Sequence, residues 1–271
     1  MRRLINQRPG PGESALLGAL PFLVLMVVYL IASQLRLAVN PEDKLLPSPA
    51  AMATTIHQYA FEEDQRTGNY LLWVDTWASL RRILTALLIS ACIGMGLALA
   101  TAVVPRIRAL LAPLIGVLSM IPPLAILPIL FIVLGLEEVA KITLIVIGIT
   151  PVITRDLALR ASELPAEQLI KAQTLGASTW QLLLRVVLPQ LWPRLIDALR
   201  LVLGSAWLFL IAAEAIASTE GLGYRIFLVR RYLAMDVILP YVIWITLLAV
   251  AMDWMLRQLR ARVFPWAASS R

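Results

Sequence analysis

Cysteine and histidine are almost absent from this sequence of 271 residues, which contains one of each. A single cysteine, Cys92, excludes a disulfide within the chain. The histidine, His57, has no cysteine or carboxylate at ligand spacing, so we expect no metal site. The sequence also lacks a glycine loop followed by Lys-Ser or Lys-Thr, which would bind nucleotide phosphates. We therefore expect no cofactor in this chain.

Charged residues are scarce as well: they make up 15% of the chain, whereas 60% of it is hydrophobic. A soluble protein of this size needs a polar surface that this composition cannot supply, which indicates a lipid environment. The net charge of +7 would suit nucleic acid. However, the basic residues punctuate apolar runs, as they do at the ends of membrane spans, so we expect no nucleic-acid binding.

The apolar runs predict an all-α integral membrane protein with about six transmembrane helices, because a span needs roughly 17–25 apolar residues. The predicted spans are 16–35, 83–104, 109–136, 139–154, 201–219 and 237–256. The third contains four prolines, so we expect a kinked or broken helix there. The first run lacks a small-residue cleavage site, which favours a retained span over a signal peptide.

The basic residues also orient the spans, because they are enriched on the cytosolic side. With the N-terminus inside, most lysines and arginines lie in cytosolic segments and both termini are cytosolic. The predicted parts are a cytosolic N-terminus (1–15), a first span (16–35), an external segment (36–77), a core domain (78–262) with a cytosolic loop (155–200), and a C-terminal tail (263–271).

Within the cytosolic loop, a helix–glycine–helix pattern runs from Pro165 to Pro189. Gly176 can end a first helix in the left-handed conformation, and Ser178 is a suitable N-cap for a second. Pro189 should stop or bend that second helix. The apolar side chains of this pattern need cover, either from a groove on a soluble partner or from the chain's own helix ends. The candidate docking residues are Leu169, Lys171, Ala172, Leu175, Gly176, Ala177, Trp180, Leu184 and Pro189.

Two features inside the predicted spans are candidates for a transport pathway. Glu214 is an ionisable residue in a span, so it should face a cavity or a partner. It would attract a cationic solute, or it would pair with an external arginine such as Arg225. Pro122 and Pro123 remove two backbone donors in succession, which favours either a pathway-lining break or a packing kink. The pathway candidates are Met120, Pro122, Pro123, Ser205, Trp207 and Glu214.

The stretch Leu175-Gly176-Ala177-Ser178, followed by Leu188-Pro189, resembles the signature loop of ABC-importer permeases of the binding-protein-dependent class. Other segments are similar to the nitrate/sulfonate/taurine branch of that family. These segments are 46–49, 79–82, 121–123, 204–207, 213–214 and 221–224. The run 165–231 also looks like permeases associated with urea-carboxylase clusters, which are linked to guanidine use. One departure is that Ile170-Lys171-Ala172 replaces the family's Glu-Ala-Ala, and Glu167 lies about one helical turn earlier.

This resemblance implies an importer-type permease fold in a bacterial cytoplasmic membrane. It also implies a permease homodimer, cytosolic ATPase subunits that dock at the loop and bind ATP and Mg, and an external substrate-binding protein. The expected substrate is a small polar solute, either nitrate/sulfonate/taurine-like or guanidine/urea-like. A secondary transporter is the alternative, although the sequence shows no inverted repeat. A membrane enzyme is disfavoured because paired acidic motifs and nucleophile–base arrangements are missing.

Overall fold

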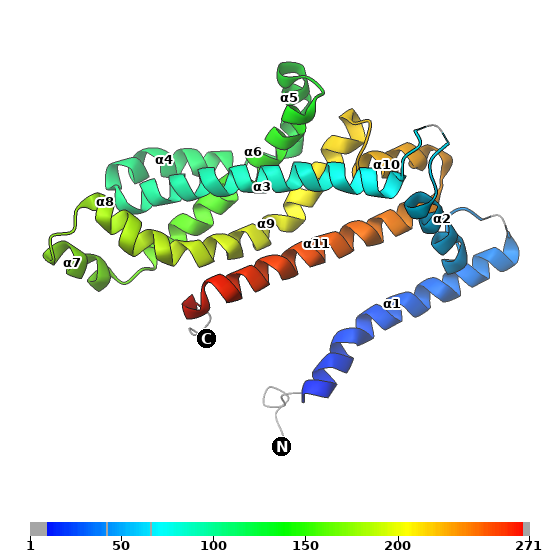
Figure 1. The fold of residues 1–271 in the computed structure, drawn as a ribbon, viewed down its shortest axis with the longest axis horizontal. Coiled ribbons are helices and arrows are strands. Elements are labelled where there is room, and N and C mark those ends of the chain that lie inside the picture. Colours follow the sequence, from blue (N-terminus) through cyan, green and yellow to red (C-terminus); the bar gives the residue numbers. More distant parts are fainter. Residues whose placement is uncertain (1–9, 42, 66, 268–271) are drawn as a thin grey trace.

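The computed structural model describes residues 10–267 except 42 and 66, and its long helices run roughly along the long axis of the molecule, whereas α5 projects away from them (Figure 1). The predicted N-terminal flank up to residue 9, Glu42, and the tail from 268 lie outside the described residues. The helices are α1 (Pro11–Val39), α2 (Pro49–Phe61), α3 (Leu71–Val103), α4 (Pro105–Leu118), α5 (Leu127–Leu134), α6 (Glu138–Ser162), α7 (Ala166–Thr174), α8 (Thr179–Leu182), α9 (Leu188–Ala217), α10 (Leu222–Val229) and α11 (Met235–Val263).

Five helices of the described part of the chain are long and apolar enough to cross a membrane, or six spans if a bent pair counts as one. The bent pair consists of α4 and the segment 123–134, which meet at 81°. Pro122 and Pro123 lie in the break, where the missing backbone donors prevent a continuous helix. The all-α membrane fold and the broken third span are thus confirmed.

The helices extend beyond the predicted spans because their charged ends find ion-pair partners. The inner end of α6 runs on from residue 154 to Ser162, where Arg160 lies 3.7 Å from Asp156. Within α9, Arg200 lies just before the predicted span, and its Nε donates to Asp253 Oδ1 of α11 at 2.7 Å. A prediction that counts uncharged residues ends each span too early at such places.

The segment predicted as external, 36–77, is largely helical. It contains α2, whose N-cap Ser48 accepts a hydrogen bond from the Ala51 N–H at 3.1 Å, and it contains the first turns of α3. The first span is also longer than predicted. Its C-terminal half is hydrogen-bonded to this segment. Tyr29 and Ser33 of α1 donate to the carbonyls of Pro47 and Leu46, at 2.7 and 3.0 Å respectively.

The predicted cytosolic loop, 155–200, is also shorter than expected, because α6 occupies its start and α9 its end. Pro189 does not stop the second helix. A π turn over Leu183–Val187 precedes α9, and the Leu188 N–H donates to the Leu183 carbonyl across it. Such a turn shifts the hydrogen-bond pattern by one residue, which allows the helix to continue through a residue without an N–H. The prediction that Pro189 stops the second helix was therefore wrong.

The core lies where α3, α6 and α9 meet, and its side chains are fully buried, among them Ile83, Leu144, Ile149, Ile153 and Leu210. The contact between α3 and α6 is close at Gly94, where an added Cβ would lie 2.8 Å from Ile153 Cγ2. Small residues permit such close approach of helices in membranes.

Candidate functional site

The elbow between α7 and α8 has the local structure that the sequence predicts. Gly176 has φ +82°, and its neighbour Ala177 donates a backbone hydrogen bond to Ala172 at 3.0 Å. Ser178 caps α8, because its hydroxyl accepts from the Gln181 N–H while Gln181 Oε1 accepts from the Ser178 N–H at 2.9 Å. The helix–glycine–helix prediction is confirmed.

The candidate docking residues divide between two faces of this elbow. Leu175 and Trp180 are 87% and 67% exposed, and Leu184 is exposed with them. Lys171 and Gly176 are also exposed, whereas Pro189 is half-buried. Leu169 and Ala172 are half-buried against the chain's own core. Leu169 and Ala177 also line a cavity of about 250 Å³ beneath the elbow. The outward face therefore consists of Leu175, Trp180 and Leu184, together with Ile170, Lys171 and Gly176.

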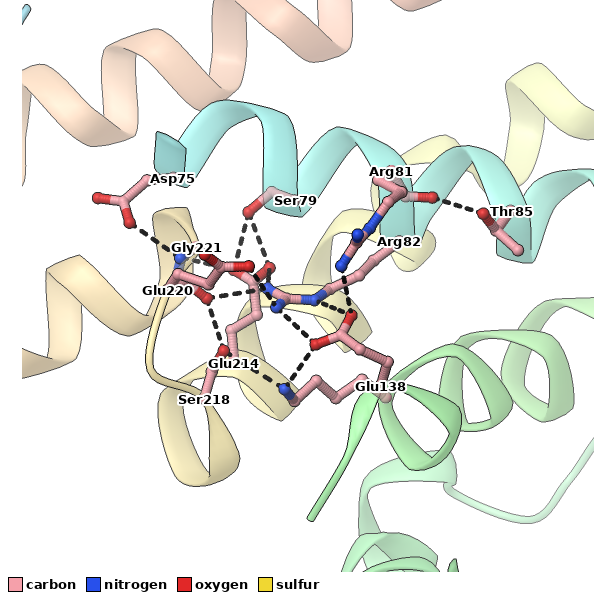
Figure 2. Close-up of polar contacts among 12 residues, drawn as sticks. Asp75, Ser79, Arg81, Arg82, Thr85, Glu138, Glu214, Ser218, Glu220 and Gly221 are labelled. Atoms are coloured by element: carbon pink, nitrogen blue, oxygen red, sulfur yellow. Dashed lines mark hydrogen bonds and ion pairs between the residues drawn. The ribbon is translucent and has the colours of Figure 1, made fainter. Parts of the chain in front are cut away.

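A buried ion-pair cluster lies at the end of the bundle opposite the elbow (Figure 1 and Figure 2), which the predicted topology makes the outer end. Arg82 of α3 and Glu214 of α9 are 1% and 0% exposed, and Arg82 Nη1 donates to Glu214 Oε1 at 2.7 Å. The Ser79 hydroxyl and the Gly223 N–H also donate to this carboxylate, each at 2.8 Å. Glu214 therefore has a cation and two further donors around it.

The guanidinium of Arg82 joins three other parts of the chain. Its Nε and Nη2 donate to the two carboxylate oxygens of Glu138 on α6, each at 2.7 Å, which is the two-pronged geometry that makes strong pairs. Its Nη1 also donates to the Glu220 carbonyl in the turn after α9, at 2.9 Å. Lys141 donates to Glu138 at 3.0 Å. Arg82 thus ties α3, α6, α9 and the turn 218–221 together.

A second buried pair adjoins this cluster and corrects one sequence-based alternative. Arg225 of α10 pairs with Asp75 of α3 at 2.7 Å, not with Glu214. Asp75 is fully buried and also accepts hydrogen bonds from Tyr241 Oη at 3.2 Å and from the Gly221 N–H at 2.9 Å. The predicted structural pair of Glu214 with an arginine is thus confirmed, but the partner is Arg82 and not Arg225, because Asp75 belongs to α3 and pairs with Arg225.

Two glycines allow the turn after α9 to pack closely against this cluster. Gly221 has φ +126°, and an added Cβ would lie 2.6 Å from the Glu214 carboxylate. A Cβ on Gly223 would lie 2.7 Å from the Ile211 carbonyl oxygen. The glycines of the segment 221–224 are therefore required by the close approach of this turn to α9. The sequence analysis did not predict the roles of Ser79 and Arg82. A usable indication was present, because an arginine next to a charge-free run can pair with a single carboxylate inside a span.

Two adjoining cavities lie beside the broken span. The smaller has a volume of about 350 Å³ and is lined by the region of the break and by α6 and α9, including Pro123, Ile147, Gly148, Ser205 and Phe209. The larger has a volume of about 610 Å³ and lies toward the inner end, with Thr101, Arg108, Arg155, Asp156 and Ser162 in its lining. Ser119, Val152 and Leu201 line both, so the two cavities adjoin each other.

Of the predicted pathway residues, Pro123 and Ser205 line the smaller cavity. Met120 and Pro122 lie at the break with exposed side chains but are not in the lining of either cavity. Trp207 is buried, and its Nε1 has no hydrogen-bond partner among the described residues. Glu214 lies in the outer cluster, away from both cavities. The structure thus brings two of the six residues together around one space.

Comparisons with known proteins agree on one family. Residues 90–265 match the model of the "Binding-protein-dependent transport system inner membrane component" family. The taurine transport system permease protein TauC of Escherichia coli is 36% identical over 195 residues, which cover 72% of this chain and 71% of the relative. The bicarbonate transport system permease protein CmpB of Synechococcus elongatus is 29% identical over 259 residues, which cover 90% and 89%.

The fold is also similar to that of a chain in an inward facing structure of the MetNI methionine ABC transporter. The TM-score is 0.58, the identity is 17%, and the match covers 71% of this chain and 95% of the other. At this identity, the similarity supports the fold alone.

Proposed function

The chain belongs to the binding-protein-dependent permeases of ABC importers, in the branch that contains taurine and bicarbonate permeases, and on this premise we propose three finer points. The chain pairs with a second copy of itself, docks an ATPase through the outward face of α7 and α8, and conducts a small solute that carries an oxyanion.

Family membership settles the broader function. The chain is a multi-pass, non-catalytic transport component of the inner membrane, and permease subunits of this kind carry no cofactor. It works with an ATPase and a substrate-binding protein. The alternatives of a secondary transporter and a membrane enzyme are thereby removed.

The observation that carries the docking proposal is the exposure of two large apolar side chains on the elbow. Leu175 and Trp180 are 87% and 67% exposed, on a segment beyond the inner ends of α6 and α9. A helical surface of this kind fits a groove on a soluble partner. Ile170 stands where the family has its glutamate, and it is exposed beside them together with Lys171. The contact with the ATPase therefore relies on apolar burial more than on an acidic residue of this chain.

Charged substitutions on the elbow test this contact. We expect Leu175→Glu and Trp180→Glu to lower the amount of ATPase that co-purifies with the permease by at least about tenfold, because central aromatic and apolar anchors dominate interface energies. Ala261→Glu is the matched control, since it adds the same charge at an exposed position near the C-terminal end of α11, outside the elbow. Retention of the ATPase at parental levels by both variants would contradict the docking proposal.

The proposal for the substrate rests on the relatives and on Glu214. The relatives named above transport taurine and bicarbonate, both of which carry an oxyanion. Glu214, the residue that suggested a cationic solute, is buried against Arg82 and Ser79 and offers no free charge. The resemblance of residues 165–231 to permeases linked to guanidine use is not tested by these comparisons, so a guanidine-like substrate stays a prediction. Affinity of the cognate binding protein for taurine and bicarbonate supports the oxyanion, whereas selective affinity for guanidinium would contradict it.

The proposal of a homodimer rests on the shape of the cavities. Ser205 in the smaller cavity and Arg155 in the larger one are exposed. One chain therefore supplies only one wall of the proposed solute route, which runs through these two cavities. A second copy related by two-fold symmetry would supply the other wall. The mass of the purified complex tests this stoichiometry: we expect two identical permease chains, and a complex with one chain or with two different permeases would contradict it.

A further inference from the structure

The inner end of the proposed route contains an arginine with unused hydrogen-bond donors. Arg155 lies on the inner third of α6 and lines the larger cavity together with Ser119, which lines both cavities. Arg155 Nη1 donates to Ser119 Oγ at 2.8 Å, directly at the C-terminal end of α4. The guanidinium therefore lies in the larger cavity beside a residue of the boundary with the smaller one.

Arg155 is not neutralised by a carboxylate. No ion pair within 4.0 Å joins it to an acidic residue in the part of the chain that the structure describes. A guanidinium has five N–H donors, and the bond to Ser119 uses only one. The planar fork of the side chain fits carboxylate, sulfonate and bicarbonate groups with two parallel hydrogen bonds.

The other charged residues of the larger cavity have partners within the chain. Arg108 donates from Nε and Nη2 to the carbonyls of Thr101 and Ala102, at 2.9 and 3.1 Å. It thereby covers the last carbonyls of α3, which is a common role for a basic residue at a helix C-terminus. Asp156 lies 3.7 Å from Arg160. Arg155 is therefore the charged side chain in this lining that is best placed to bind a solute.

We propose that Arg155 binds the oxyanion of the solute as it leaves the smaller cavity toward the cytosol, and that Ser119 holds the guanidinium between passages. This inference rests on the proposed function, because it assumes that the two cavities form the route. It assigns a specificity-determining contact to one residue: the guanidinium selects an oxyanion over a cation at the inner opening.

The single native cysteine makes a direct test simple. The variant Cys92→Ala is free of cysteine, and Ser205→Cys in this background places one thiol in the smaller cavity. The permease–ATPase complex is treated from its inner side with an anionic and a cationic thiol reagent, sulfonatoethyl and trimethylammonioethyl methanethiosulfonate. We expect Arg155→Gln to lower the ratio of the anionic to the cationic labelling rate by at least about tenfold, because loss of one unit of positive charge slows the anionic reagent and speeds the cationic one.

Two further variants separate the role of Arg155 from a general effect of charge or folding. Arg155→Lys keeps the positive charge, so the ratio of the anionic to the cationic labelling rate should stay close to that of the parent protein. Arg160→Gln removes a charge one helical turn away that is already paired with Asp156 and Glu163, so it should leave the ratio unchanged. An unchanged ratio in Arg155→Gln, or an equal fall in Arg160→Gln, would overturn this inference while the route stands. No labelling of Ser205→Cys by either reagent would overturn the route itself.

Discussion

The outer and inner ends of the bundle surround their arginines in different ways. At the outer end, Arg82 is 1% exposed and bonded to Glu138 and Glu214, and Arg225 pairs with the buried Asp75. At the inner end, Arg155 is exposed in a cavity and bonded only to a serine hydroxyl among the described residues. Buried pairs with saturated hydrogen bonds hold helices in one arrangement, whereas an arginine with free donors can bind a solute. This contrast supports the proposal that Arg82 and Arg225 hold the helices together at the outer end, whereas Arg155 binds the solute at the inner end.

The largest effect that this comparison predicts is the loss of Arg82. Arg82→Ala leaves Glu214 buried without its cation, and removal of one partner from a buried pair costs about 3–5 kcal/mol. We expect a large loss of folded permease in detergent, measured by thermal unfolding.

The neighbouring arginine provides the control for this prediction. Arg81 is 54% exposed and lies 3.6 Å from Glu138, so Arg81→Ala should cost no more than about 1 kcal/mol, as exposed pairs do. Equal stability of the two variants would show that the outer cluster does not hold the bundle together.

A smaller effect is expected from the turn that presses on this cluster. Gly221→Ala forces a side chain into φ +126° and places its Cβ 2.6 Å from the Glu214 carboxylate. Backbone strain of this kind costs about 1–3 kcal/mol, before any displacement of Glu214. Gly96→Ala on α3 has no atom within 4 Å of the added Cβ and should be neutral or slightly stabilising. Similar melting temperatures for both variants would contradict the account of the turn.

The smallest effect concerns the inner elbow. Ser178→Ala removes the side-chain cap of α8, which is worth about 1 kcal/mol, and should speed hydrogen exchange at the Gln181 amide about fivefold. Thr174→Ala is the control, because the Thr174 hydroxyl donates only to the Lys171 carbonyl within its own helix. Exchange that rises equally in both variants would indicate that the cap does not order the elbow.

The sequence was most informative where a residue type has one strong local preference. Consecutive prolines predicted the break between α4 and α5, and Gly176 with Ser178 predicted the elbow. These features depend on backbone geometry that neighbouring residues determine, so they need no knowledge of distant contacts.

The partners of buried charges were harder to predict, because they depend on where helices begin. Asp75 was assigned to an external segment, so Arg225 remained free to pair with Glu214 in the sequence-based picture. The structure begins α3 at Leu71, which places Asp75 beside Arg225 and Arg82 beside Glu214. Likewise, no local signal showed that a π turn would carry the helix through Pro189.

The most direct test of the difference between the two ends compares two thiols on the same helix. In the Cys92→Ala background, Ser205→Cys reports on the cavity, and Ala213→Cys, which is 0% exposed, reports on the outer cluster. A small neutral thiol reagent is applied to the assembled permease–ATPase complex, and the labelling rates are compared. The account predicts fast labelling at Ser205→Cys and protection at Ala213→Cys; equal rates, or faster labelling at the outer position, would contradict it.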